Sequence, residues 1–91
     1  MFGSEDFGKQ IDEIHEWERK KSVQALVISF EFRYPIRVLA KSGSITKQDA
    51  DRICSGIRKI VSKKISAIKY EAFTRRAKVL RRKKRLEREQ E

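Results

Sequence analysis

Apolar residues recur at helical spacing along the first third of the chain. At intervals of three or four residues, the stripe contains Phe7, Ile11, Ile14, Trp17, Ala25, Ile28 and Phe32. Such spacing puts these side chains on one face of a helix. Lys21 interrupts the stripe but can lay its alkyl stem along it. Ser4 is a suitable N-cap residue, so we predict a helix that begins near Ser4 and buries this face.

The segment 26–34 fits two kinds of structure. Every second residue of this segment is large and apolar: Leu26, Ile28, Phe30, Phe32 and Tyr34. Alternation of this kind is typical of a strand, but no second stretch alternates as cleanly, so a strand would have to pair with another chain. As a helix, the segment is apolar on almost all sides and must be buried on two of them. We favour the helix, and we predict that these five residues mediate self-association or docking on a larger complex.

Proline and glycine mark two boundaries. Pro35 lacks a backbone donor and clashes with the carbonyl four residues earlier, which predicts a kink or break near Pro35 and a short helix from there to Ser42. Gly43 suits the left-handed position just past a helix end. Ser44 or Thr46 can cap the helix that follows. The segment around Gly43 is therefore predicted to be the turn of a helical hairpin.

The second half of the chain predicts one long helix. No proline occurs between Thr46 and Arg88, and only Gly56 disfavours a helix there. A core-facing stripe runs through Ala50, Ile53, Cys54, Ile57, Ile60, Val61, Ile65, Ile68 and Ala72. It thins after Phe73, which we assign to its end, so residues 81–91 should form a projecting or frayed tail.

The predicted fold is thus all-α. It is a single helical domain over residues 1–91, arranged as an antiparallel helical hairpin with a long basic C-terminal helix. The alternative is one intermolecular β-strand at 26–34 combined with helices.

Charge is distributed unevenly along this pattern. The formal net charge is +10, yet residues 1–50 carry eight acidic and eight basic side chains. The whole surplus therefore lies in residues 51–91. An asymmetry of this size indicates an anionic partner.

The basic segment favours nucleic acid as that partner. Fourteen Lys and Arg residues occupy positions 58–88, against only Glu71 and Glu87. Each phosphate that a cation neutralises releases condensed counterions and adds affinity, and the Arg guanidinium grips phosphate with two donors. The predicted phosphate contacts are Lys63, Lys64, Arg75, Arg76, Lys78, Arg81, Arg82, Lys83, Lys84 and Arg85. RNA within a larger assembly is slightly favoured over DNA, because the distal helix is cationic on nearly all sides.

Other functions stay open from the sequence. Folding the chain at Gly43 places the acidic residues of 5–18 beside residues 68–80, where they can neutralise Lys69, Arg75, Arg76 and Lys78 but not the bases of 81–85. The chain then serves as a protein–protein interaction or assembly module. A small dimeric DNA-binding transcriptional regulator is a further alternative, resembling a ribbon-helix-helix dimer if 26–34 is a strand.

Residues for catalysis are almost absent. The chain has one histidine, His15, and one cysteine, Cys54, and it contains no phosphate-binding loop, zinc-ligand spacing or nucleophile motif. We therefore expect no enzymatic activity, cofactor, metal or small-molecule substrate. No apolar run approaches the ~20 residues of a membrane span, and the N-terminus lacks the apolar core of a signal peptide. A cytoplasmic protein that does not bind membranes is expected.

Overall fold

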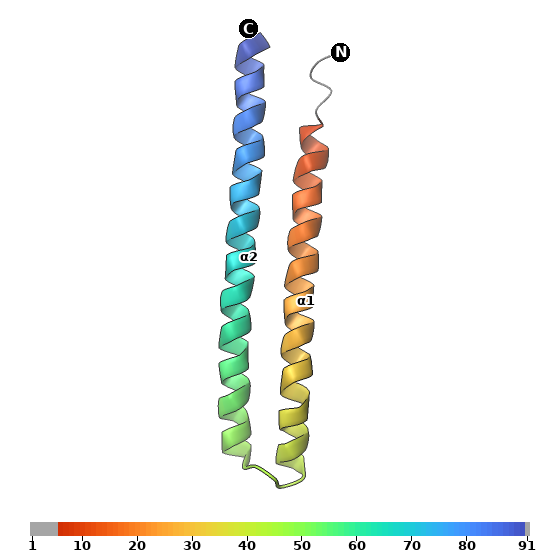
Figure 1. Ribbon diagram of the computed structural model, residues 1–91, viewed down its shortest axis with the longest axis vertical. Coiled ribbons are helices and arrows are strands. Elements are labelled where there is room, and N and C mark those ends of the chain that lie inside the picture. The colour runs from red at the N-terminus through yellow and green to blue at the C-terminus, as the bar shows by residue number, and fades with distance from the viewer. Residues whose placement is uncertain (1–5, 91) are drawn as a thin grey trace.

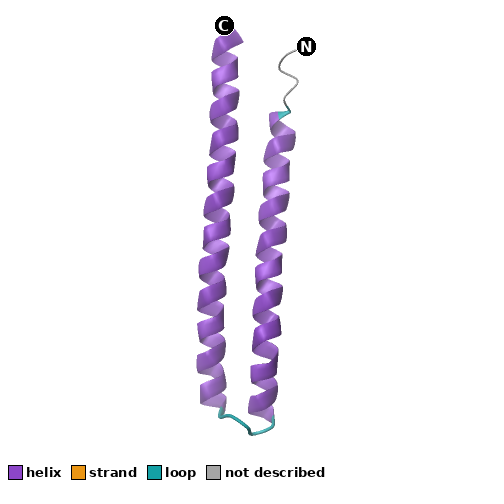
Figure 2. Cartoon of the chain, in the orientation of Figure 1, coloured by secondary structure: helices purple, strands orange, loops and turns teal. Residues whose placement is uncertain are grey.

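The computed structural model describes residues 6–90 as two helices joined by a short turn (Figure 1). α1 spans Phe7–Lys41 and α2 spans Lys47–Gln90. They run antiparallel and side by side, and the last turns of α2 extend beyond the start of α1 (Figure 1). Figure 2 shows helix and loop throughout this part of the chain, which forms a thin rod of 71 × 17 × 9 Å. The predicted all-α helical hairpin is confirmed.

Residues 26–34 lie inside α1, so the strand alternative is wrong for this segment. The helix also continues through Pro35, and the predicted break, with its separate helix from Pro35 to Ser42, is wrong too. Proline removes one backbone hydrogen bond at this point. The turns beyond it stay aligned because Ile36 and Ala40 are half-buried in the contact with α2. A bend of the helix axis at Pro35 stays a prediction.

Side chains cap both helices at their N-termini. The Asp6 carboxylate accepts a hydrogen bond from the Lys9 backbone N–H at 2.9 Å and begins α1. Ser4, the predicted cap, lies outside the described residues. The Thr46 hydroxyl accepts a hydrogen bond from the Asp49 backbone N–H at 3.0 Å and begins α2. Each cap satisfies a backbone donor that the first turn of a helix leaves free.

The turn has the hydrogen bonds of a Schellman motif. The Ser44 N–H donates to the Leu39 carbonyl at 3.0 Å, and the Gly43 N–H donates to the Ala40 carbonyl at 3.2 Å. Gly43 has a φ of 79°, in the left-handed region that the sequence predicted. The hairpin therefore reverses direction at a position where a side chain is disfavoured.

We expect Gly43→Ala to destabilise the protein by about 1–2 kcal/mol, because a Cβ disfavours the left-handed conformation. A methyl group at this position meets no other atom within 4 Å, so backbone strain alone is tested. Gly56→Ala is the matched control, since its added Cβ also meets nothing, and there the free energy of unfolding should rise by about 1 kcal/mol. Urea unfolding followed by circular dichroism measures both. Equal stability of G43A and the wild type would contradict the turn geometry.

The contact between the helices repeats every 11 residues. On α1 it is formed by Phe7, Ile11, Ile14, Glu18, Ser22, Ala25, Ser29, Arg33, Ile36 and Ala40, and on α2 by Ala50, Cys54, Ile57, Val61, Ile65, Ile68, Ala72, Arg76 and Val79. All of these residues are buried or half-buried. An 11-residue period gives about 3.67 residues per turn, close to the natural 3.6, so nearly straight helices keep facing each other.

This period corrects the stripe predicted for α1. The sequence stripe followed a seven-residue repeat through Ala25, Ile28 and Phe32, whereas the structure turns Ser29 and Arg33 toward α2 instead. Ser29 is only 3% exposed, and its hydroxyl accepts a hydrogen bond from Arg33 Nε at 3.2 Å. Buried residues between the helices are mostly small. Most large apolar side chains of residues 23–39 are consequently left outside this contact.

Candidate nucleic-acid interface and apolar surface

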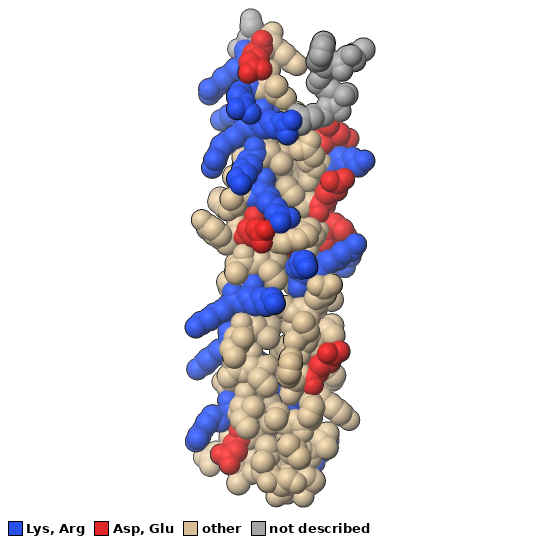
Figure 3. Space-filling view, in the orientation of Figure 1, with Lys and Arg blue, Asp and Glu red and all other residues tan. Residues whose placement is uncertain are grey.

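The basic residues of α2 gather in the half that is distant from the turn. Figure 3 shows Lys and Arg over that half of the rod, while the half near the turn has few charges on the same face. All ten predicted phosphate contacts lie on α2, and nine of them are exposed. The exception is Arg76, which is half-buried.

Arg75 and Arg76, two adjacent members of this set, make contacts within residues 6–90. Arg76 Nη1 lies 3.2 Å from Glu18 Oε2, and the side chains are 24% and 21% exposed. Arg75 Nη2 lies 2.7 Å from Glu71 Oε1, and the Arg75 guanidinium carbon lies 4.1 Å from the centroid of the Trp17 ring. A cation over a Trp face adds attraction beyond the ion pair. Arg75 and Arg76 thus hold the two helices in register and are less available to a ligand.

Most of the remaining cations have no counter-charge within residues 6–90. The side chains that make no ion pair with a carboxylate there are Lys63, Lys64, Lys78, Arg81, Lys83, Lys84 and Arg85. They lie on a helix that continues unbroken to Gln90. Their charged groups are therefore exposed to solvent along one continuous helix.

The acidic residues of α1 neutralise little of this charge. Of the ion pairs that the sequence allowed between the N-terminal acids and α2, only the one between Glu18 and Arg76 forms among the described residues. Glu16 instead binds Arg19 of its own helix at 2.7 Å, and the hydrogen bond from Arg19 lowers the pKa of the Glu16 carboxyl. Neutralisation within the hairpin thus accounts for a small part of the basic segment.

A second feature is the apolar surface of α1. It is formed by Val23, Leu26, Val27, Ile28, Phe30, Phe32, Tyr34, Val38 and Leu39, which are 42–63% exposed. The five predicted partner residues all belong to it, and the rings of Phe30 and Tyr34 lie 6.1 Å apart along one flank. Among residues 23–39, the two bases are engaged inside the hairpin, Arg33 with Ser29 and Arg37 with Asp51.

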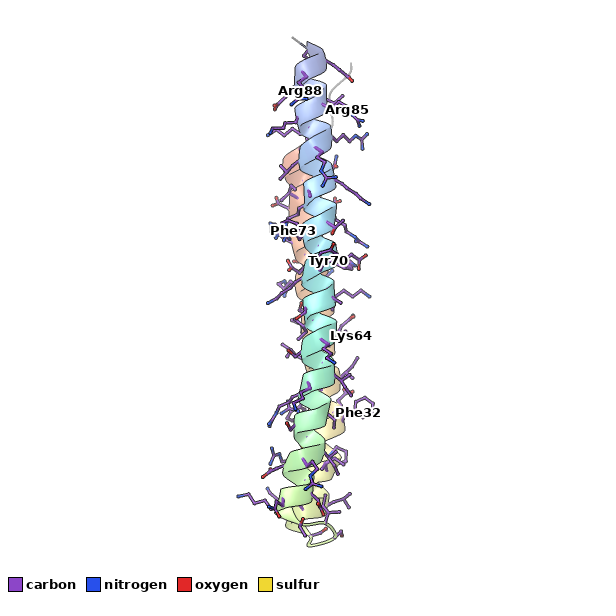
Figure 4. All side chains as sticks on the ribbon, turned by 90° about the vertical axis from the view of Figure 1, so that its left-hand side faces the viewer. Phe32, Lys64, Tyr70, Phe73, Arg85 and Arg88 are labelled. Atoms are coloured by element: carbon purple, nitrogen blue, oxygen red, sulfur yellow. The ribbon has the colours of Figure 1, made fainter. Side chains whose placement is uncertain are left out.

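Two aromatic residues of α2 are exposed. Phe73, which was predicted to end the core stripe, is 63% exposed, so that prediction is wrong, and the neighbouring Tyr70 is 73% exposed. Ala72, which was predicted to belong to the stripe, is fully buried. Figure 4 looks onto α2 from the side away from α1 and shows both rings there. Extending the 11-residue spacing from Ala50 and Val61 to Ala72 was the signal that could have placed them outside.

The described part of the chain has no cluster of side chains suited to a metal site. No group of three His, Cys, Asp or Glu side chains there is arranged to hold a metal ion. His15 is exposed, and Cys54 is fully buried between the helices. Neither helix, over residues 6–90, has a stretch long and apolar enough to cross a membrane.

Comparison of the chain with protein-family models, with curated proteins and with solved structures finds no match.

Proposed function

We propose that this protein binds nucleic acid without catalysing a reaction, and that α2 from Lys63 to Arg85 contacts the phosphate backbone of RNA or DNA. The observation that carries the proposal is the set of exposed α2 cations that have no carboxylate partner among residues 6–90. The helix fixes the spacing of their backbone positions, and the long side chains extend from it into solvent. RNA within a larger assembly is slightly favoured, since these cations surround the helix.

The length of the basic segment suits several phosphates at once. From Lys63 to Arg85 the helix rises about 33 Å at roughly 1.5 Å per residue. One turn of a DNA duplex is about 34–36 Å long, so the segment runs along about one turn and can reach the phosphates of either strand that face it. Contact with six or more phosphates is therefore within the reach of this surface.

The salt dependence of binding tests this proposal. The dissociation constant of the full chain for a dye-labelled RNA or DNA of about 20 nucleotides should rise by roughly 1,000-fold between about 50 and 200 mM salt if six phosphates are engaged. Fluorescence anisotropy measures it. A dissociation constant that does not change with salt rejects backbone contact as the source of affinity.

The apolar surface of α1 favours a second candidate function, self-assembly. Its nine side chains lie on both flanks of α1 at about 100° per residue, and together they expose on the order of 900 Å², since a large side chain presents about 150–250 Å² when fully exposed. A standard protein interface buries about 800 Å² on each partner. We infer that a second copy of this chain covers the apolar surface of α1.

Charge favours one arrangement of the two copies. A parallel pair would bring the two basic ends of α2 side by side. An antiparallel pair, overlapping only through the halves near the turn, places these ends at opposite tips of a longer rod. Like charges separated by more than about 10 Å are largely screened at ordinary salt concentrations. The antiparallel overlap therefore buries the apolar surface without that repulsion.

The ribbon-helix-helix form of a DNA-binding regulator is not proposed, because it needs a strand where residues 26–34 form helix. A dimeric regulator that binds duplex DNA through the basic helix remains a variant of the first proposal. It differs in its expected ligand, since it should prefer duplex DNA to single strands.

A further inference from the structure

One face of α2 combines cations with exposed aromatic rings. The aromatic stripe of α2 consists of Lys59, Lys63, Ser66, Tyr70, Phe73, Ala77, Arg81, Lys84 and Arg88. Successive members are three or four residues apart, so they share one side of the helix. All are exposed except Ala77, which is half-buried. None belongs to the contact between the helices.

The two rings at the centre of this stripe have no apolar role inside the hairpin. Tyr70 and Phe73 are 73% and 63% exposed and lie three residues apart on the outer side of α2 (Figure 4). The ring–ring contact found among residues 6–90 is on α1, between Phe30 and Tyr34. Exposed rings of this size are disfavoured in water. Their position on α2 also separates them from the apolar surface of α1.

Cations stand on both sides of these rings along the helix. Lys63 precedes Tyr70 by about two turns, and Arg81 and Lys84 follow Phe73 by about two and three turns. Neither Lys63, Arg81 nor Lys84 has an ion-pair partner in the described chain. A protein partner that placed an apolar patch on the rings would have to desolvate or neutralise these charges. A single-stranded nucleic acid offers base faces for the rings and phosphates for the cations together.

We propose that Tyr70 and Phe73 form a stacking site for bases of a single-stranded nucleic acid, whose phosphates are held by Lys63, Arg81 and Lys84. This inference rests on the proposed nucleic-acid-binding function and narrows its ligand class. A duplex cannot use the site, since its base faces are stacked on one another and hidden. Stacking on side chains tolerates every base, so the site confers little sequence preference.

The test compares single and double strands of one sequence. We measure binding of the full chain to a dye-labelled oligonucleotide of about 20 nucleotides, alone and annealed to its complement, by fluorescence anisotropy. The single strand should bind about 10-fold more tightly or better, and Y70A/F73A should weaken its binding by roughly 10- to 100-fold while leaving the duplex affinity unchanged. Y70F/F73Y, which keeps both rings, should bind like the wild type. Both side chains are exposed, and circular dichroism verifies that the variants remain helical.

Three other outcomes overturn the stacking site. Equal binding of single strand and duplex, with no effect of Y70A/F73A, rejects it while leaving salt-dependent backbone binding in place. Loss of self-association in Y70A/F73A, seen as a lower mass in solution, shows that the rings form a protein interface. Absence of salt-dependent binding to either oligonucleotide overturns the proposed function itself.

Discussion

Reversing the charge of Arg81, Lys84 and Arg85 should weaken nucleic-acid binding by on the order of 100-fold or more at about 100 mM salt. Each lost charge-assisted hydrogen bond to phosphate removes about 1 kcal/mol or more, and about 3 kcal/mol corresponds to roughly 100-fold in affinity. The three residues have no ion-pair partner among residues 6–90, so R81E/K84E/R85E removes no known contact within the fold. Fluorescence anisotropy with a labelled RNA measures the change.

The control for net charge is K47E/R52E/R58E, which makes the same change on the turn-proximal half of α2. All three control residues are exposed. Because they lie outside the distal segment, the control should lose far less affinity than the distal variant. Equal losses in the two variants would show that overall charge, rather than the distal surface, determines binding.

Replacing three aromatic residues of the apolar surface of α1 should convert a dimer into a monomer. Phe30, Phe32 and Tyr34 are each about 60% exposed in the single chain. In the proposed dimer Phe30 and Tyr34, which share one flank of α1, become buried, and burial of one such side chain contributes about 1.5–3 kcal/mol. F30Q/F32Q/Y34Q removes these contributions from both copies, while Gln keeps a good helix propensity. Light scattering after size exclusion should give twice 10.8 kDa for the wild type and 10.8 kDa for the variant.

Tyr70→Gln with Phe73→Gln is the matched control, because it removes exposed rings from α2 instead. That variant should remain dimeric. If the triple variant loses its helical circular dichroism signal, the single variant F30Q is used in its place. F30Q should shift the equilibrium toward the monomer by a smaller but measurable amount. A wild-type chain that is monomeric at high micromolar concentration contradicts the assembly proposal and leaves nucleic-acid binding untouched.

The hairpin was predictable because its signals are local. Gly43 marks the reversal, since only glycine adopts a φ of 79° at no steric cost. Absence of proline after Thr46, together with regular apolar spacing, predicted α2. The behaviour of Pro35 was less predictable, because packing of the following turns against α2 outweighs the loss of one backbone hydrogen bond. Rules based on neighbouring residues do not take account of the packing between α1 and α2, which are joined only through the turn.

The side chains that face the partner helix were harder to predict. Hydrophobicity pointed to Ile28 and Phe32, yet Ser29 and Arg33 occupy the contact. Small side chains let the two backbones approach closely, and the Ser29 hydroxyl is satisfied by Arg33. An 11-residue repeat containing serines gives a weak hydrophobic signal. Phe73 is a separate error, because it follows the buried Ala72 directly and lies about 100° from it around the helix.

The sequence predicted where the basic residues lie, but not which of them form ion pairs with carboxylates. Composition alone located the cations on the second helix. It did not distinguish Arg76, which is held by Glu18, from Arg81 and Lys84, which have no such partner in the described residues. Ion pairs of that kind depend on the register of the two helices. Most of the cations that are available to phosphate therefore lie in the distal turns of α2.

If the distal cations of α2 contact phosphates, they determine the slope of the logarithm of the binding constant against the logarithm of salt concentration. With about six contacts, the slope for the wild type should be near −4 to −5, and R81E/K84E/R85E should flatten it by about 2 to 3. Equal slopes for the two proteins would show that these side chains touch no phosphate, and would contradict phosphate contact by the distal part of α2.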